Sequence, residues 1–322
     1  MFSRLSARLS ARRSTSAFGV SFKRKQIFQK VLLAAIALIF ISLLPTVFIR
    51  LKNRASGERR ELQHLFESGA FEGAYGRSRE LLKEKPLDFF LLTIHGFSAY
   101  QLAIAQINNF DTLSYVDDCV WALRKAMLKS EGSQLSDGRV FYVLGKAYFY
   151  KGTEYADLAV NYLEKARAAS HKAADIPEYL GLAYAAIRDF RSSVAAFALA
   201  LSGEGTVPSD VLLLSIARSY LGLEELESAK AYLVRCLEIS RDSRTIAAGR
   251  LLLGGVLSQA GDIPGAEAEY LKVMEESGEN AEARYQLGEL YASAGDTTRA
   301  RAEWRRALRI DPAHGPARSR LN

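Results

Sequence analysis

The sequence has few of the residues on which catalytic and metal sites depend. Its 322 residues include two cysteines, four histidines and seven prolines. The histidines are dispersed, and none has a second ligand at the spacing of a zinc site. No Ser-His-Asp or paired-carboxylate arrangement stands out from the ordinary charged positions. We therefore predict no metal, no other cofactor and no enzymatic activity, and the few prolines favour an all-helical chain.

Acidic residues are nearly absent from the first 60 positions, which contain 13 Lys or Arg and only Glu58. The net charge of this segment is +12, so residues 61–322 carry −5 although the whole chain carries +7. The basic excess thus belongs to the N-terminal segment. It gives no reason to expect that the rest of the chain binds nucleic acid.

Residues 31–49 contain no charged side chain and are bounded by Lys30 and Arg50. A helix of this length rises about 28 Å, close to the roughly 30 Å of a bilayer's hydrocarbon core. We predict a single transmembrane helix here, between a basic cytoplasmic tail at 1–30 and a juxtamembrane linker at 50–56. A buried core helix and a cleaved signal peptide are the alternatives.

The eight positive charges of residues 1–30, with no acid among them, favour a cytoplasmic N-terminus, because such a tail resists translocation. We expect the bacterial inner membrane, with the remainder of the chain in the periplasm. The first 20 residues are also rich in Arg and Ser and place Phe2, Leu5 and Leu9 on one helical face, as mitochondrial transit peptides do. The mitochondrial inner membrane is therefore the alternative location.

A 34-residue period organises the C-terminal part of the chain. Leu253-Gly254 and Leu287-Gly288 are 34 residues apart, and small and aromatic residues follow each pair at the same offsets. In the last unit, Gly288 and Ala300 are small enough for two helices to approach closely, and Trp304 fills the space beside them. Pro312 then ends the second helix of that unit.

This pattern resembles the tetratricopeptide repeat, a helix-turn-helix unit of 34 residues. The resemblance implies an all-α, right-handed solenoid with five repeats over 138–314 and degenerate repeats over 57–137. In the degenerate part, Gly96 and Cys119 are 23 residues apart where the regular units have 12, so the extra residues either extend a helix or form a loop. The residues that carry the resemblance are Leu144, Gly145, Tyr148, Leu180, Gly181, Tyr184, Ala217, Tyr220, Leu253, Gly254, Ala266, Leu287, Gly288, Tyr291, Ala300, Trp304 and Pro312. Cys119 and Cys236 occupy slots for small side chains and are expected to be core thiols.

In this family the first helix of each repeat lines a concave groove that binds peptides. The groove positions, carried over residue by residue, are Arg139, Tyr142, Lys146, Phe149, Asp175, Glu178, Leu182, Leu214 and Arg218. Their aromatic and basic members imply an extended or helical peptide of acidic character. The alternative is that they are ordinary solvated side chains. The carboxylate clamp of some family members is absent apart from Lys146.

A solenoid needs a polar cap, since its last repeat otherwise exposes a stacking face. We predict that residues 315–322 form a tail too short for a full capping helix. The flank of the last helix, at Trp304 and Leu308, is then a candidate docking face. Crowding of that face by arginines is the alternative protection.

Together these features predict a membrane-anchored scaffold for protein–protein interactions in the assembly or organisation of an envelope complex. Its partners would be proteins or peptides and, through one span, the membrane, but not nucleic acid. A periplasmic chaperone-like factor that binds translocated or unfolded clients is one alternative. An accessory subunit of a membrane enzyme is another, and a homo-oligomer is compatible with each.

Overall fold

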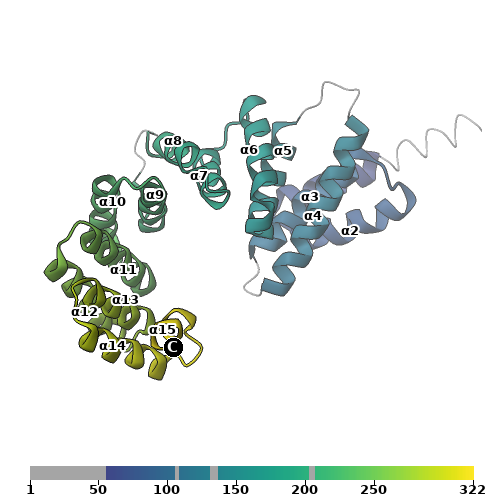
Figure 1. Cartoon of the computed structure of the whole chain (residues 1–322). Coiled ribbons are helices and arrows are strands. Elements are labelled where there is room, and N and C mark those ends of the chain that lie inside the picture. Colours follow the sequence, from purple (N-terminus) through teal and green to yellow (C-terminus); the bar gives the residue numbers. More distant parts are fainter. Residues whose placement is uncertain (1–55, 106–108, 131–136, 203–206) are drawn as a thin grey trace, which may run out of the picture. The chain divides into compact units, whose positions relative to one another are not determined.

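The computed structural model describes residues 56–105, 109–130, 137–202 and 207–322, which are helical throughout apart from turns and short connections (Figure 1). The transmembrane helix predicted at 31–49 lies outside these ranges. Within them, no helix has both the length and the apolar character to cross a membrane. The chain divides into two units, Met1–Ala74 and Tyr75–Asn322, and the boundary falls within one helix.

The described part of the first unit is a helix over 56–67, a turn and the start of α2 (Phe71–Glu84). Gly69 adopts a φ of +78° in this turn, a conformation that glycine reaches without steric cost. The rings of Phe66 and Phe71 pack edge to face across the turn, with centroids 5.5 Å apart. The sequence over 65–74 predicts a turn at Gly69 between two helices, and the structure confirms it.

The second unit continues with paired helices. In chain order the pairs are α3 (Phe89–Ala105) with α4 (Asn109–Ser130), α5 (Gly138–Lys151) with α6 (Ala156–Ala168), α7 (Ile176–Ala186) with α8 (Phe190–Leu201), α9 (Asp210–Gly222) with α10 (Leu226–Ile239), α11 (Ser243–Gln259) with α12 (Ile263–Ser277), and α13 (Ala281–Ser293) with α14 (Thr297–Ile310). A short 3-10 helix, η1 (Thr153–Tyr155), joins α5 to α6, and α15 (Gly315–Leu321) ends the chain.

The turn within several pairs has one recurring design. A residue with positive φ, such as Gly261 or Gly295, is followed by an aspartate that caps the next helix. The Asp262 carboxylate accepts a hydrogen bond from the amide of Gly265, and the Asp296 carboxylate accepts one from Arg299. Such N-caps satisfy amides that would otherwise lack a partner at the start of a helix. In the sequence, Gly261-Asp262 and Gly295-Asp296 predict the turns of the last two repeats, and the structure confirms both.

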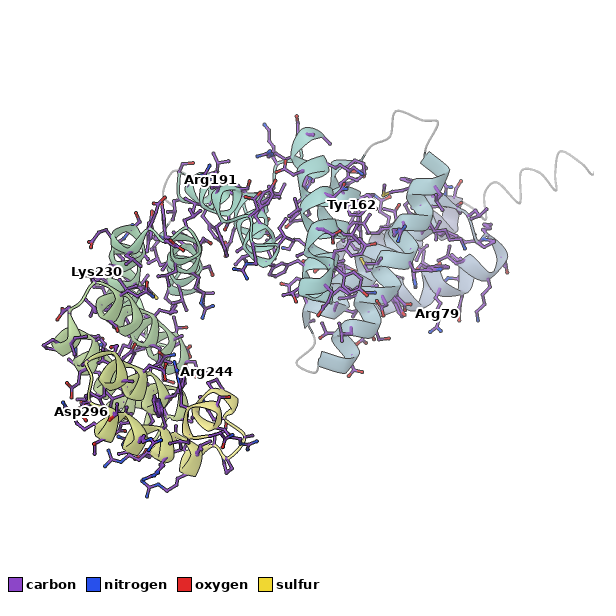
Figure 2. All side chains as sticks on the ribbon, viewed as in Figure 1. Arg79, Tyr162, Arg191, Lys230, Arg244 and Asp296 are labelled. Carbon is purple, nitrogen blue, oxygen red and sulfur yellow. The ribbon has the colours of Figure 1, made fainter. Side chains whose placement is uncertain are left out.

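The predicted close approach within each pair is also present, and side chains fill the space between the paired helices (Figure 2). A Cβ atom placed on Gly181 would lie 2.4 Å from the ring of Phe197, and one on Gly288 would lie 2.5 Å from Trp304. In the α9–α10 pair, Ala217 stands at the glycine position, and Leu233 replaces the aromatic residue. The small residue on the first helix of a pair thus leaves the space that a larger side chain on the second helix fills.

The extra residues between Gly96 and Cys119 lengthen helices. Helices α3 and α4 contain 17 and 22 residues, whereas α13 and α14 contain 13 and 14. Of the two outcomes expected from the sequence, helix extension is therefore the one observed in the described residues. Cys119 and Cys236 are free and buried, as core thiols should be.

The C-terminal residues differ from the prediction, because residues 315–321 form α15 instead of a tail. His314 caps this helix by accepting a hydrogen bond from the Ala317 amide, and Ala317 is fully buried in the same core as Trp304. Trp304 is only 7% exposed, and Leu308 is partly buried against that core. The open docking face predicted at Trp304 and Leu308 is therefore wrong. A seven-residue helix is too short to be stable by propensity, and its packing on α14 stabilises it.

Candidate functional site

The predicted groove residues of α5 and α7 form one connected group. Tyr142, Lys146 and Phe149 lie one turn apart along α5, and Asp175 immediately precedes α7. Tyr150 and Tyr179 complete the group, in which neighbouring rings pack at centroid distances of 5.2 Å (Phe149 and Tyr179) and 5.8 Å (Phe149 and Tyr150). We call these six residues the Lys146 cluster.

Lys146 is the centre of the cluster and is only 9% exposed. Its ammonium nitrogen lies 2.7 Å from Asp175 Oδ2 and 3.1 Å from the Tyr142 hydroxyl oxygen. The Tyr142 hydroxyl in turn donates to Asp175, at 2.8 Å. The positive charge predicted to attract an acidic peptide is therefore already neutralised. The spacing in the sequence did not reveal this ion pair, because Asp175 belongs to the next repeat and approaches Lys146 only in the fold. The acidic character of a bound peptide stays a prediction.

Aromatic rings surround the ammonium group of Lys146. It lies 4.2 Å from the ring centroid of Tyr179, 5.1 Å from that of Tyr142 and 5.9 Å from that of Tyr100. Such cation–π contacts stabilise the charge beyond what the carboxylate provides. Tyr150 stands at the edge of the cluster, 39% exposed, and its hydroxyl is 3.0 Å from that of Tyr179. The cluster thus presents aromatic surface and tyrosine hydroxyls over a neutralised ion pair.

The pKa values of the cluster follow from burial and hydrogen bonding. Burial opposes the charge on Lys146, but its hydrogen bonds to Asp175 and Tyr142 prevail and raise its pKa above the ordinary value. Burial and the hydrogen bond with Tyr179 raise the pKa of Tyr150 to about 12. Both residues therefore keep their protons more tightly in the folded state than in the unfolded chain.

These shifts predict that the cluster loses stability at alkaline pH. A group whose pKa is raised by folding contributes its full stabilisation below its unfolded pKa, about 10 for tyrosine and lysine. The contribution disappears as the pH rises through the folded pKa, about 12 for Tyr150. The thermal midpoint should therefore stay constant from about pH 7 to 9 and fall above about pH 10. A Tyr150→Phe variant should show a shallower fall, and an identical fall would exclude Tyr150 as a contributor.

The other predicted groove residues lie outside the cluster's hydrogen bonds. Arg139 is exposed and pairs with Asp137, at 3.0 Å, at the start of α5. Leu214 is 6% exposed and belongs to the core around α9 and α10, so its assignment to an open groove is wrong. Arg218 is exposed, and Glu178 and Leu182 are partly buried, without a contact that joins them to Lys146. The residues that sequence reasoning missed are Tyr150 and Tyr179, which neighbour predicted positions on the same helices.

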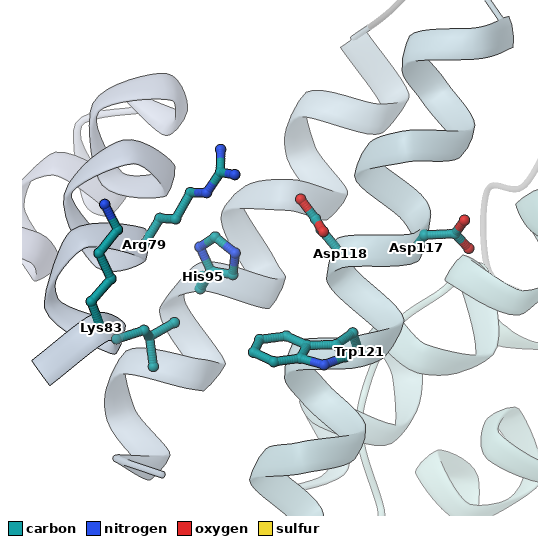
Figure 3. A pocket seen from close by; sticks show the side chains of 7 residues that line it. Arg79, Lys83, His95, Asp117, Asp118 and Trp121 are labelled. Carbon is teal, nitrogen blue, oxygen red and sulfur yellow. The ribbon is translucent and has the colours of Figure 1, made fainter. Parts of the chain in front are cut away.

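A cavity of about 530 Å³ lies between α2, α3 and α4 (Figure 3). Helix α2 contributes Arg79, Leu82 and Lys83, α3 contributes His95, and α4 contributes Asp117, Asp118 and Trp121. Sequence reasoning did not identify this site, because none of the lining residues on these three successive helices belongs to a motif. The signal in the sequence was the irregular spacing of this part of the chain, where Gly96 and Cys119 are 23 residues apart.

His95 forms a buried wall of this cavity. Its ring stacks on Tyr75, with centroids 4.6 Å apart, and its Nδ1 lies 3.0 Å from Ser78 Oγ. The Ser78 hydroxyl also lies 2.9 Å from the carbonyl oxygen of Tyr75, so it connects the imidazole to the backbone of α2. Burial lowers the pKa of His95 in spite of the nearby Asp118 carboxylate. The imidazole is therefore a neutral, fixed part of the wall.

The described residues contain no group of three or more His, Cys, Asp or Glu side chains placed to hold a metal ion. Both sites present hydrogen-bonding groups, charged side chains and aromatic surfaces. Such surfaces bind other molecules through complementarity.

Two segments of the chain match the tetratricopeptide repeat family, residues 212–243 and residues 257–321. Within these two segments the chain carries tetratricopeptide repeats. The matched segments contain most of α9, all of α10, and α12 to α15. The terminal helix α15 lies within the second match, although the sequence reading placed it outside the repeats.

Solved structures share this fold at low sequence identity. The C-terminal part of a TPR repeat-containing protein from Cytophaga hutchinsonii is 18% identical, with a TM-score of 0.55 over 82% of this chain and 99% of that one. PilW, a type IV pilus biogenesis factor, is 17% identical, with a TM-score of 0.56 over 70% of this chain and 98% of PilW. The apo form of RapI is 16% identical, with a TM-score of 0.55 over 81% and 77%. No curated protein matches the chain in sequence.

Proposed function

We propose that this tetratricopeptide-repeat chain is a scaffold that binds a protein partner through the Lys146 cluster. The observation that carries the proposal is the partly exposed aromatic surface of Phe149, Tyr150 and Tyr179 over a neutralised ion pair. Tyrosine and other aromatic residues dominate the energetics of protein interfaces, because they bury much area at low entropic cost. The internal Lys146–Asp175 pair keeps these side chains in place before a partner arrives.

The charge balance of the cluster narrows the kind of partner. Because Asp175 neutralises Lys146, long-range attraction of an acidic peptide is not its main contribution. A segment with apolar or aromatic side chains, and with backbone groups that reach the hydroxyls of Tyr150 and Tyr179, complements this surface better. We therefore replace the acidic peptide expected from the sequence by a largely uncharged one.

The proposed setting is a membrane. The uncharged run over 31–49 and its basic flanks support a single-pass anchor. We infer that the repeats act in the bacterial periplasm in the assembly or organisation of an envelope complex. PilW, which has a similar fold, is a type IV pilus biogenesis factor, so an envelope assembly role has precedent on this fold.

The test is capture of a partner by the full-length chain in its native membranes. The chain should sediment with the membrane fraction and, after mild-detergent extraction, copurify with a discrete partner identified by mass spectrometry. A Tyr150→Ala and Tyr179→Ala double variant should recover about ten-fold less of that partner, as loss of an aromatic hot spot does. Leu199→Ala is the matched control, because Leu199 is 54% exposed on α8, outside the cluster.

Two results would contradict the proposal. Recovery of the chain in the soluble fraction would contradict the proposed membrane anchor. Equal recovery of the partner by the double variant and by wild type would move the interaction away from the Lys146 cluster. Circular dichroism of each variant distinguishes lost binding from lost folding.

A further inference from the structure

We propose that the cavity between α2, α3 and α4 is a second peptide-binding site, for a partner segment that carries a carboxylate side chain beside an aromatic or apolar one. The Lys146 cluster uses α5 and α7, the first helices of their pairs. The cavity instead takes most of its lining from α2 and α4, with α3 supplying His95 (Figure 3). A partner bound in the cavity would therefore contact different helices from a partner bound at the Lys146 cluster.

The two walls of the cavity differ in the charge that they leave available. On α4, Asp118 accepts a hydrogen bond from the Tyr75 hydroxyl, and Asp117 pairs with Lys151. On α2, Arg79 and Lys83 have no carboxylate within ion-pair distance in the described part of the chain. They lie four residues apart, so both reach the same side of the helix. The α2 wall therefore offers two cations to an incoming anion, whereas the α4 carboxylates already have donors.

Trp121 supplies the surface for an aromatic or apolar side chain. It projects from α4 at the cavity, and 52% of it remains exposed. The ammonium of Lys125 lies 4.5 Å from its ring centroid, which fixes the indole from one side. Leu82, at 8% exposure, adds apolar surface on α2. A half-exposed tryptophan and an arginine that line the same cavity are residue types enriched in interface hot spots.

The size and the mixed charge of the cavity favour a short peptide segment over other ligands. A volume of about 530 Å³ holds a few side chains, within the roughly 300–1,000 Å³ range of ligand pockets. An extended polyanion is disfavoured, because the two cations of the lining, Arg79 and Lys83, are too few for a row of phosphates. A single carboxylate fits, since Arg79 can bind it through two parallel hydrogen bonds while the adjacent side chain packs on Trp121.

The experiment begins with a random 12-residue peptide display library selected on the full-length chain in mild detergent. We expect enrichment of sequences with Asp or Glu next to Phe, Tyr, Trp or Leu. Fluorescein-labelled peptides from this pool should bind an Arg79→Glu and Lys83→Glu double variant at least about ten-fold more weakly in polarisation titrations. Arg301→Glu with Arg305→Glu is the matched control, an exposed pair with the same spacing on α14, and should stay within about two-fold of wild type.

Tryptophan emission gives an independent readout. The chain has two tryptophans, and Trp304 is buried. Peptide binding should therefore shift the emission of half-exposed Trp121, and a Trp121→Phe variant should lose the shift.

Three outcomes would overturn the proposal: unchanged affinity in the Arg79 and Lys83 double variant, enrichment of basic instead of acidic peptides, or loss of binding in the Tyr150 and Tyr179 double variant. The last outcome would assign the peptides to the Lys146 cluster. If the chain bound peptides at the cavity but captured no partner through the Lys146 cluster, only the function proposed above would be overturned.

Discussion

Replacing Gly254 with alanine is expected to lower the free energy of unfolding by about 2 kcal/mol, because the added methyl group overpacks a filled core. A Cβ atom at this position would lie 2.5 Å from Cε1 of Tyr270 and 2.9 Å from its Cδ1 and Cζ. Tyr270 is 2% exposed and is surrounded by core side chains, so its ring has no free space into which to move. Urea unfolding followed by circular dichroism measures the change.

Gly255 provides the control on the same helix. The nearest atom to a Cβ at Gly255 is the Tyr270 hydroxyl oxygen, at 4.0 Å. Alanine there should raise the free energy of unfolding by about 0.5–1 kcal/mol, since it restricts the unfolded chain and favours the helix. If Gly254→Ala and Gly255→Ala changed stability alike, the close approach of α11 and α12 would not be the reason for the glycine.

The α9–α10 pair suggests how to rescue the Gly254→Ala variant. There, Ala217 packs in the same core as Leu233, which stands at the position equivalent to Tyr270. A Tyr270→Leu substitution should therefore reduce the cost of Gly254→Ala by about 1 kcal/mol or more, measured as the coupling energy of a double-mutant cycle. Strict additivity would show that the two residues do not share this space.

The repeat architecture was predictable because each signature residue reports a local packing demand. A glycine sixteen residues before a large aromatic residue, as at Gly181 and Phe197, indicates two helices that must nearly touch. The turns were predictable for a similar reason, since positive φ and an N-capping aspartate occupy adjacent positions. The packing rule and the turn rule each involve residues of one helix pair that are close in the sequence, so both can be recognised in a single sequence.

The features that sequence reasoning missed depend on contacts between pairs. Asp175 neutralises Lys146 from 29 positions away, in the next pair of helices, and no spacing rule connects the two residues. The cavity is lined by residues of α2 and by Trp121 of α4, and the lengthened helix α3 lies between these two helices in the chain. Helix α15 forms through contacts of Ala317 with the core of the preceding pair. Propensity within the last eight residues gives little sign of it.

A buried charge network follows the same 34-residue period as the packing signature. Arg250 lies 2.9 Å from Glu269, and Arg284 lies 3.1 Å from Glu303, 34 positions further along for each partner. Glu269 and Glu303 are only 8% and 5% exposed. A second cation completes each site: Lys272 contacts Glu269, and Arg306 contacts Glu303. Each glutamate on a second helix is thus stabilised by an arginine from the first helix of its own pair.

Replacing Arg250 with methionine should lower the free energy of unfolding by about 3 kcal/mol, because it removes the arginine that pairs with the buried Glu269 and with Glu276. The loss should stay near the low end for a broken buried pair, since Lys272 remains 2.6 Å from the carboxylate. Arg244→Met is the matched control: Arg244 is exposed on the same helix, so its removal should change stability by less than about 0.5 kcal/mol. Adding Glu269→Leu to Arg250→Met should restore most of the loss, because the stranded charge, and not the missing attraction, causes it. If the double variant were as unstable as Arg250→Met alone, the arginine would act through the packing of its aliphatic stem.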